Sequence, residues 1–184
     1  MSLAPSRLPH ADASAPDGPC PGETTDDIDL LYARPGFLLR RAHQLSVAVF
    51  ESACSDLAIT PGQFAVLSVL RTDGTLDQSS VARAIGLDKV TVSLLLRGLE
   101  ARGWVDRRVT LGNRRKRSLT LTPAGREILR RSQAPADAAY EALMAPFDAR
   151  QRAELVTLLR QLVLGLEPCA RAPLEPLRQS RTLR

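Results

Sequence analysis

The feature that most constrains the fold is a short helical pattern with two different faces. Asp88 can cap its start, and Gly103 suits its end. Between them, four apolar residues recur at the spacing i, i+3, i+4 and i+7: Val92, Leu95, Leu96 and Leu99. Such a stripe has to be buried, so the rest of the chain must supply a core around it.

The opposite face of this helix also carries apolar side chains. Val90, Leu94 and Arg97 fall roughly opposite the stripe. Its flanks carry Lys89, Thr91 and Ser93. Exposed Val and Leu are mildly unfavourable in water, whereas in the major groove of DNA apolar groups can contact thymine methyls and hydroxyls can reach base edges. An ordinary surface helix is the alternative, so this helix alone does not establish DNA binding.

Another short helix precedes it. Asp77 can cap this helix, and Gly86 suits the left-handed residue at its end. Its apolar residues lie three and four positions apart: Val81, Ala84 and Ile85. Two helices joined by a short turn are common in all-α proteins, so this pair is compatible with several functions.

A basic β-hairpin is predicted next. Residues 104–111 and 118–122 are β-branched and partly alternating, and 111–114 has turn chemistry. Six cations lie on this hairpin, opposed only by Asp106: Arg107, Arg108, Arg114, Arg115, Lys116 and Arg117. Such a cluster repels itself unless it is solvated or meets an anion.

The order of these elements predicts a winged helix that binds double-stranded DNA. In that arrangement the second helix lies in the major groove, and an arginine of the wing enters the minor groove. A basic run alone is usually a solvated loop, but its place after two helices favours DNA. The candidate contacts are Gln78, Ser79, Lys89, Val90, Thr91, Ser93, Leu94, Arg97, Arg107, Arg114, Arg115, Lys116 and Arg117.

From about Pro35 to Leu166 the sequence resembles the MarR family of bacterial transcriptional regulators. The segments 91–93, 99–105, 113–115 and 119–125 resemble its T-V-S, L-E-x-x-G-[LW]-V, D-R-R and L-x-L-T-x-x-G signatures. Asn113 stands where the family usually has Asp, and Leu94 where many members carry Arg or another polar residue. These departures put the stability of the wing and the base preference in question.

The resemblance implies a mainly α fold with a small β-hairpin wing. Its winged helix-turn-helix lobe spans about 58–122, and dimerisation helices span about 33–57 and 123–166. Pro135 should kink or split the helix that follows the hairpin. The last helix has a stripe denser than one small domain needs: Leu155, Leu158, Leu159, Leu162, Val163 and Leu166. We therefore expect a homodimer and an inverted-repeat operator with half-sites ~10 bp apart.

MarR-like regulators usually respond to small, often anionic aromatic ligands. Arg40, His43 and Phe50 lie on neighbouring sides of the first long helix and could hold a carboxylate and a ring. Alternatively, Arg40 and His43 are solvated or cap a helix of the partner. Residues 34–44 also resemble regulators of aromatic-acid catabolism. The resemblance thus implies a repressor that is released by its ligand.

Composition limits the alternatives. The net charge of +5 fits an anionic partner, and we find no enzymatic motif and no stretch of the ~20 apolar residues that span a bilayer. We expect a cytoplasmic protein without a cofactor or metal, with a disordered arm (1–27) and a flexible tail (167–184).

Cys20, Cys54 and Cys169 lack disulfide or zinc spacing. A cysteine-oxidation sensor and an effector-free architectural DNA-binding protein remain alternatives.

Overall fold

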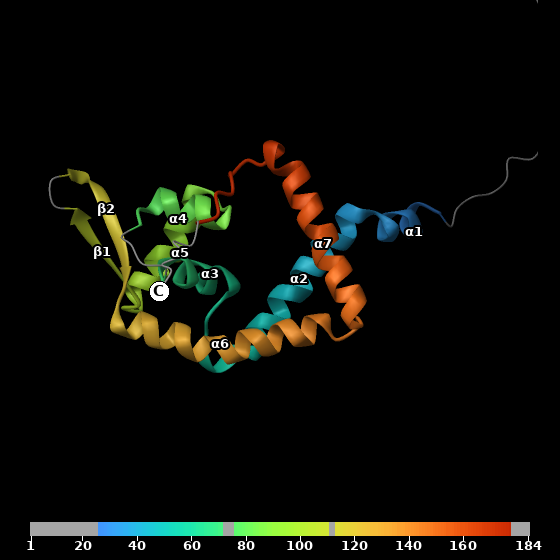
Figure 1. Cartoon of the computed structure of the whole chain (residues 1–184), viewed down its shortest axis with the longest axis horizontal. Coiled ribbons are helices and arrows are strands. Elements are labelled where there is room, and N and C mark those ends of the chain that lie inside the picture. The colour runs from blue at the N-terminus through green and yellow to red at the C-terminus, as the bar shows by residue number, and fades with distance from the viewer. Residues whose placement is uncertain (1–25, 72–75, 111–112, 178–184) are drawn as a thin grey trace, which may run out of the picture. The chain divides into compact units, whose positions relative to one another are not determined.

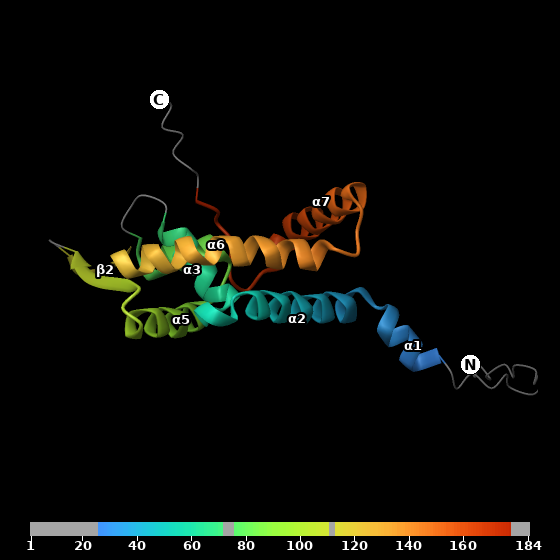
Figure 2. The ribbon, with the colours of Figure 1, turned by 90° about the horizontal axis from the view of Figure 1, so that it is seen from below.

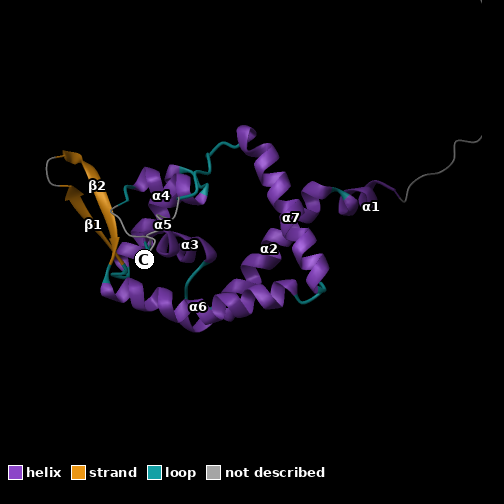
Figure 3. Ribbon diagram, viewed as in Figure 1, coloured by secondary structure: helices purple, strands orange, loops and turns teal. Residues whose placement is uncertain are grey.

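The computed structural model describes residues 26–71, 76–110 and 113–177 (Figure 1). The helices are α1 (Asp26–Ala33), α2 (Pro35–Ala53), α3 (Pro61–Leu70), α4 (Gln78–Ile85), α5 (Lys89–Ala101), α6 (Pro123–Met144) and α7 (Ala149–Leu166), with short 3-10 helices η1 (Ser55–Leu57) and η2 (Glu167–Cys169). The strands are β1 (Val105–Thr110) and β2 (Asn113–Leu121). Within these residues the fold is mainly α with one hairpin, which confirms the predicted class (Figure 3).

The core lies where α3, α4, α5, the hairpin and the start of α6 meet. Its residues share almost complete burial: Val66, Leu67, Leu70, Val81, Ala82, Val92, Leu96, Leu99, Val105, Leu119, Leu121, Ile128 and Leu129. The predicted stripe of α5 supplies three of them, while Leu95 is half-buried and packs beside Gly62. Burying each large apolar side chain contributes roughly 1.5–3 kcal/mol, so this cluster is the main stabilising feature of the lobe.

Side-chain caps define where the helices begin. Thr60 and Gln63 form a reciprocal capping box at α3, with N···O distances of 3.3 and 3.2 Å. Asp77, Thr122 and Asp148 likewise accept hydrogen bonds from the first turns of α4, α6 and α7. The start of α4 at Asp77 was predicted from local sequence, because a cap is a short-range interaction.

The hairpin is antiparallel and pairs Val105 with Leu121 at its base. Its register shifts between Val109 and Thr110, which marks a bulge toward the turn. Leu76 adds an isolated bridge to the hairpin, since the Leu119 N–H donates to the Leu76 carbonyl over 2.8 Å.

Helix α6 is continuous, so of the two outcomes expected at Pro135 the split does not occur (Figures 1 and 2). The ribbon bends near its middle in Figure 1, as a proline inside a helix favours. Proline removes one backbone donor, but helical residues extend from Pro123 to Met144 on both sides of it. Burial of Ala139 and Met144 beyond the proline helps to keep the second half helical.

The N-terminal helices differ from the prediction. Helix α1 was not predicted at all, and its Tyr32 ring packs edge-on against Phe37, with 5.1 Å between the ring centroids. Helix α2 ends at Ala53, and the chain continues as η1 rather than as helix to Leu57. Ala58 closes η1 in the left-handed conformation, at φ 46°. Residues 1–25 of the predicted arm lie outside the described residues.

Part of the predicted flexible tail lies against α4 instead. We call residues 170–177 the C-terminal strap. The Glu175 N–H donates to the Arg83 carbonyl (2.8 Å), and the Glu175 carboxylate pairs with the Arg83 guanidinium (2.9 Å). The Leu174 side chain lies beside Gly86, and its N–H donates to the Glu167 carboxylate (2.6 Å). Residues 178–184 lie outside the described residues.

We predict that Gly125→Ala destabilises the protein strongly. A Cβ at Gly125 would lie 1.9 Å from the Trp104 carbonyl oxygen, so the backbone of α6 or of the hairpin has to move. We expect the free energy of unfolding to fall by about 3 kcal/mol or more in urea titrations. Gly165→Ala is the matched control, because a Cβ there meets nothing within 4 Å. Equal stability of the two variants would contradict the prediction.

Candidate nucleic-acid interface

Helix α5 presents an exposed outer face. Its inner residues Val92, Leu96 and Leu99 are fully buried. On the opposite side Val90 is 71% exposed and Leu94 is 56% exposed. The cationic residues Lys89 and Arg97 are exposed as well, whereas Thr91 and Ser93 are half-buried. The outer face therefore combines apolar side chains with cations, as the sequence predicted.

Asp88 fixes the start of α5. One carboxylate oxygen accepts hydrogen bonds from the N–H groups of Val90 and Thr91, both at 2.9 Å. The other accepts the Thr91 hydroxyl over 2.6 Å. The Thr91 hydroxyl and then its N–H hold the pKa of Asp88 below its usual value, because they stabilise the carboxylate. Thr91 thus acts first as part of the cap, and its hydroxyl keeps only acceptor capacity for other partners.

Gln78 connects the two helices of the helix-turn-helix. Its side-chain amide donates to the Lys89 carbonyl over 3.2 Å, at the first residue of α5. Ser79 is half-buried in the first turn of α4. These two predicted contact residues therefore lie near the start of α5, and Gln78 also has a structural role.

The two arginines described at the base of the hairpin differ in their partners and in their exposure. The Arg107 guanidinium pairs with the Glu100 carboxylate of α5 at 2.6 Å, and their side chains are only 20% and 29% exposed. Arg107 therefore joins the hairpin to α5 and is poorly placed for an external anion. The Arg108 guanidinium pairs with the Asp106 carboxylate at 2.6 Å, but its side chain is 79% exposed. Arg108 was not among the DNA contacts predicted from the sequence.

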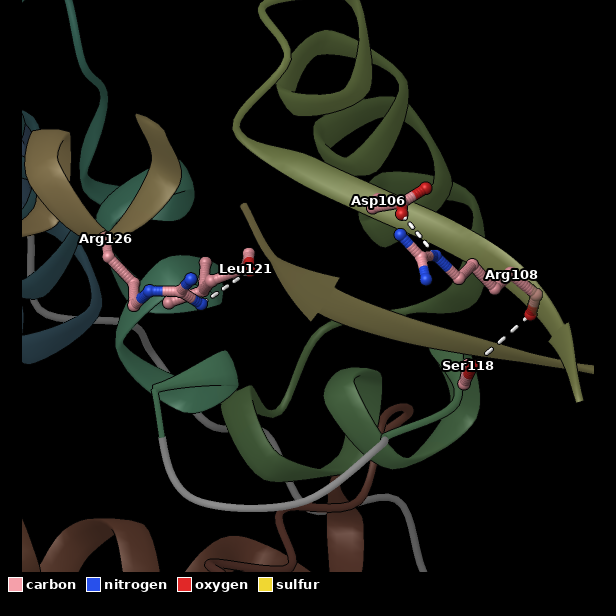
Figure 4. A network of polar contacts seen from close by, with 5 residues as sticks. All are labelled: Asp106, Arg108, Ser118, Leu121 and Arg126. Atoms are coloured by element: carbon pink, nitrogen blue, oxygen red, sulfur yellow. Dashed lines mark hydrogen bonds and ion pairs between the residues drawn. The ribbon is translucent and has the colours of Figure 1, made fainter. Parts of the chain in front are cut away.

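Figure 4 shows how this base is held. The Ser118 hydroxyl donates to the Arg108 carbonyl across the two strands, over 3.3 Å. Arg126 in the first turn of α6 donates to the Leu121 carbonyl at the end of β2, over 2.8 Å. The backbone of Arg114, Arg115, Lys116 and Arg117 lies in β2, but their side chains lie outside the described part of the structure.

The candidate ligand residues are not brought together within the chain. Arg40 and His43 are exposed on α2, whereas Phe50 is half-buried and packs on Phe64, with 5.5 Å between the ring centroids. His43 and Phe50 are seven residues apart, which separates them by ~10 Å along a helix. The described residues that line a nearby hollow of about 530 Å³ are all uncharged: Ala48, Val49, Ser52, Ala53, Ala138, Ala139 and Ala142.

The cysteines differ in exposure. Cys54 is 1% exposed, and burial raises the pKa of its thiol, which disfavours the reactive thiolate. Cys169 is exposed, and Cys20 lies outside the described residues. Within residues 26–71, 76–110 and 113–177, no cluster of three or more His, Cys, Asp or Glu residues could hold a metal ion. No helix in that part of the chain is long and apolar enough to cross a membrane.

We predict an acid-dependent contribution of Asp88 to stability. Because its pKa is lowered on folding, its charged form stabilises the fold above the unfolded pKa, about 4, and this contribution disappears as the pH falls through the folded pKa. Asp88→Asn keeps a capping oxygen without the charge. The difference in unfolding temperature between wild type and Asp88→Asn should therefore be largest near pH 6 and shrink below pH ~4. A difference independent of pH would contradict this.

Comparison with known proteins identifies the same region. Residues 59–116 match the MarR family. The HTH-type transcriptional repressor NicR of Pseudomonas putida is 30% identical over 151 residues, which cover 82% of this chain and 91% of NicR.

Solved structures share the fold. BpsR of Bordetella bronchiseptica, solved in work on how 6-hydroxynicotinic acid regulates its DNA binding, is 32% identical with a TM-score of 0.67, over 71% of this chain and 94% of BpsR. The repressor CouR, bound to a 23-mer DNA duplex, is 26% identical with a TM-score of 0.68, over 74% of this chain and 97% of CouR. With the NicR match, they show that this chain belongs to the MarR family of winged helix-turn-helix transcriptional regulators, which are DNA-binding proteins and not enzymes.

Proposed function

We propose that the protein is a homodimeric repressor that binds an inverted-repeat operator and is released by a small aromatic carboxylate. The observation that carries this proposal is the outer face of α5, which lies opposite the buried Val92, Leu96 and Leu99. Its exposed residues are Lys89, Val90, Leu94 and Arg97. NicR and CouR are named as repressors.

The charge distribution around α5 fits double-stranded DNA. A helix of this diameter fits the major groove, and Lys89 and Arg97 can contact phosphates on either side of it. The nearby acids are occupied, since Asp88 caps the helix and Glu100 pairs with Arg107. Arg108 replaces Arg107 among the residues that we propose to contact DNA. We keep the arginines and lysine near the start of β2, Arg114–Arg117, as contacts for the minor groove.

A second copy of the chain is the proposed partner of α7. Its apolar side chains are substantially exposed in the single chain: Leu158, Leu159, Leu162, Val163 and Leu166. Soluble proteins seldom leave such a contiguous surface in water, so we infer a two-fold dimer. The dimer would present two α5 helices to successive major grooves, which requires half-sites ~10 bp apart.

The ligand proposal rests on BpsR, whose DNA binding is regulated by 6-hydroxynicotinic acid. Arg40 and His43 are exposed on one side of α2 and can bind a carboxylate. Phe50 is engaged with Phe64, so the aromatic contact has to come from another residue or requires Phe50 to move. Ligand binding would favour a dimer geometry that no longer matches the operator, and DNA would weaken ligand binding by the same factor.

The two alternative functions, oxidation sensing and architectural DNA binding, can be tested separately. Oxidation sensing needs an exposed, low-pKa thiol, and buried Cys54 does not meet that condition. A peroxide-induced disulfide that abolishes DNA binding would establish it. An architectural protein would bind random DNA nearly as well as an operator, whereas we expect a preference of at least ~10³-fold.

We predict that a panel of aromatic carboxylates, added to the preformed complex with the upstream intergenic DNA, contains a compound that lowers the fluorescence anisotropy. Arg40→Ala and His43→Ala should each raise the concentration needed for release about ten-fold or more. Arg41→Ala is the matched control, because this exposed arginine points about 100° away on the same helix. Equal release from all three variants would place the ligand elsewhere.

We also predict that Arg97→Ala weakens binding to operator and random DNA alike. Loss of one phosphate contact should reduce the slope of log K against log salt by about one unit. Arg131→Ala, an exposed arginine on α6, serves as the control and should leave the slope unchanged. An unchanged slope in Arg97→Ala would remove this residue from the interface.

A further inference from the structure

We infer that Val90 and Leu94 form a reader of thymine methyl groups, so that the operator requires thymine at the base pairs beneath them. This inference rests on the proposed function and names what its site recognises. The two side chains, 71% and 56% exposed, are the large apolar groups on the outer face of a helix whose core stripe is already complete.

The spacing of the pair suits the base step of DNA. Residues four apart lie on one face of a helix, separated by ~6 Å along its axis. Successive base pairs are ~3.4 Å apart, so the pair spans about two steps. Both residues belong to the first half of α5, the end from which a recognition helix contacts base edges.

The chemistry of the pair selects one base. In the major groove, thymine presents a methyl group, whereas cytosine, adenine and guanine present mainly hydrogen-bond donors and acceptors there. Val90 and Leu94 cannot bond those groups, and covering them without a partner costs free energy. Covering a methyl group instead removes apolar surface of both partners from water.

The neighbours of the pair favour DNA over a protein as the occupant. Lys89 and Arg97 lie beside the apolar pair and remain exposed, which suits a surface bordered by phosphates. The carboxylate at this end, Asp88, has both oxygens occupied by Val90 and Thr91, so it does not offer a competing acceptor. An apolar protein groove would instead have to desolvate these cations.

The test removes one methyl group at a time. Duplexes selected by the full-length protein from a randomised pool define the preferred half-site. Each thymine is then replaced singly by deoxyuridine, which keeps the base pair and lacks the methyl. We expect about a three- to five-fold loss of affinity at one or two thymines per half-site, as the burial of one methyl group predicts. Deoxyuridine outside the half-sites should have no effect.

Protein variants assign the effect to the pair. Leu94→Ala should abolish the deoxyuridine loss at one thymine and Val90→Ala at the other, because the methyl then has no apolar partner. Ser93→Ala should leave these losses unchanged, whatever it does to overall affinity. Both apolar residues lie off the buried stripe, so the unfolding temperatures should match wild type.

The outcomes separate this inference from the proposed function. Tight, selective binding without a thymine preference, or with full tolerance of deoxyuridine, would overturn the methyl reader and leave the repressor proposal standing. A deoxyuridine loss that persists in both Leu94→Ala and Val90→Ala would also overturn it, because another residue would then read the methyl. Failure to select any duplex would overturn both proposals.

Discussion

The close contact between Trp104 and the first turn of α6 joins three elements of the lobe around its buried core. The Thr122 N–H donates to the Trp104 carbonyl (3.1 Å), and the Thr122 hydroxyl donates to the Gly103 carbonyl (2.6 Å). Gly125 allows this approach because it has no Cβ. The end of α5, the base of the hairpin and the start of α6 therefore meet within a few atoms. This junction therefore connects the end of α5 to the start of α6 directly, beside the base of the hairpin.

Local signals in the sequence predicted the caps, the buried stripe of α5 and the hairpin, because each depends on residues within a few positions of one another. What was missed depends on distant or weak interactions. Arg107 looked like a free cation because its partner Glu100 precedes it by seven residues, across the end of a helix. The contact between Glu175 and Arg83 joins positions far apart in the chain, so proline-rich sequence suggested a loose tail.

Two exposed apolar surfaces of this chain differ in their borders, and this difference distinguishes their proposed partners. On α5, Val90 and Leu94 have cations beside them and an occupied carboxylate at the helix start. On α7, the exposed leucines form a longer apolar stripe, which suits the proposed pairing with the same surface of a second copy. The exposed fraction of the side chains alone does not distinguish a DNA-binding surface from a dimer surface. These two roles are distinguished by the charges at the edge of each surface and by its length.

The C-terminal strap follows α7 in the chain and contacts α4. It therefore connects these two helices in addition to the main chain that runs from α4 to α7. Fully extended, its eight residues would span on the order of 25 Å. While Leu174 contacts Gly86 and Glu175 pairs with Arg83, α4 is restrained with respect to the end of α7. Their release would enlarge the range of positions open to the lobe and leave every helix intact. The strap therefore restrains α4 through contacts at its surface, outside the buried core of the lobe.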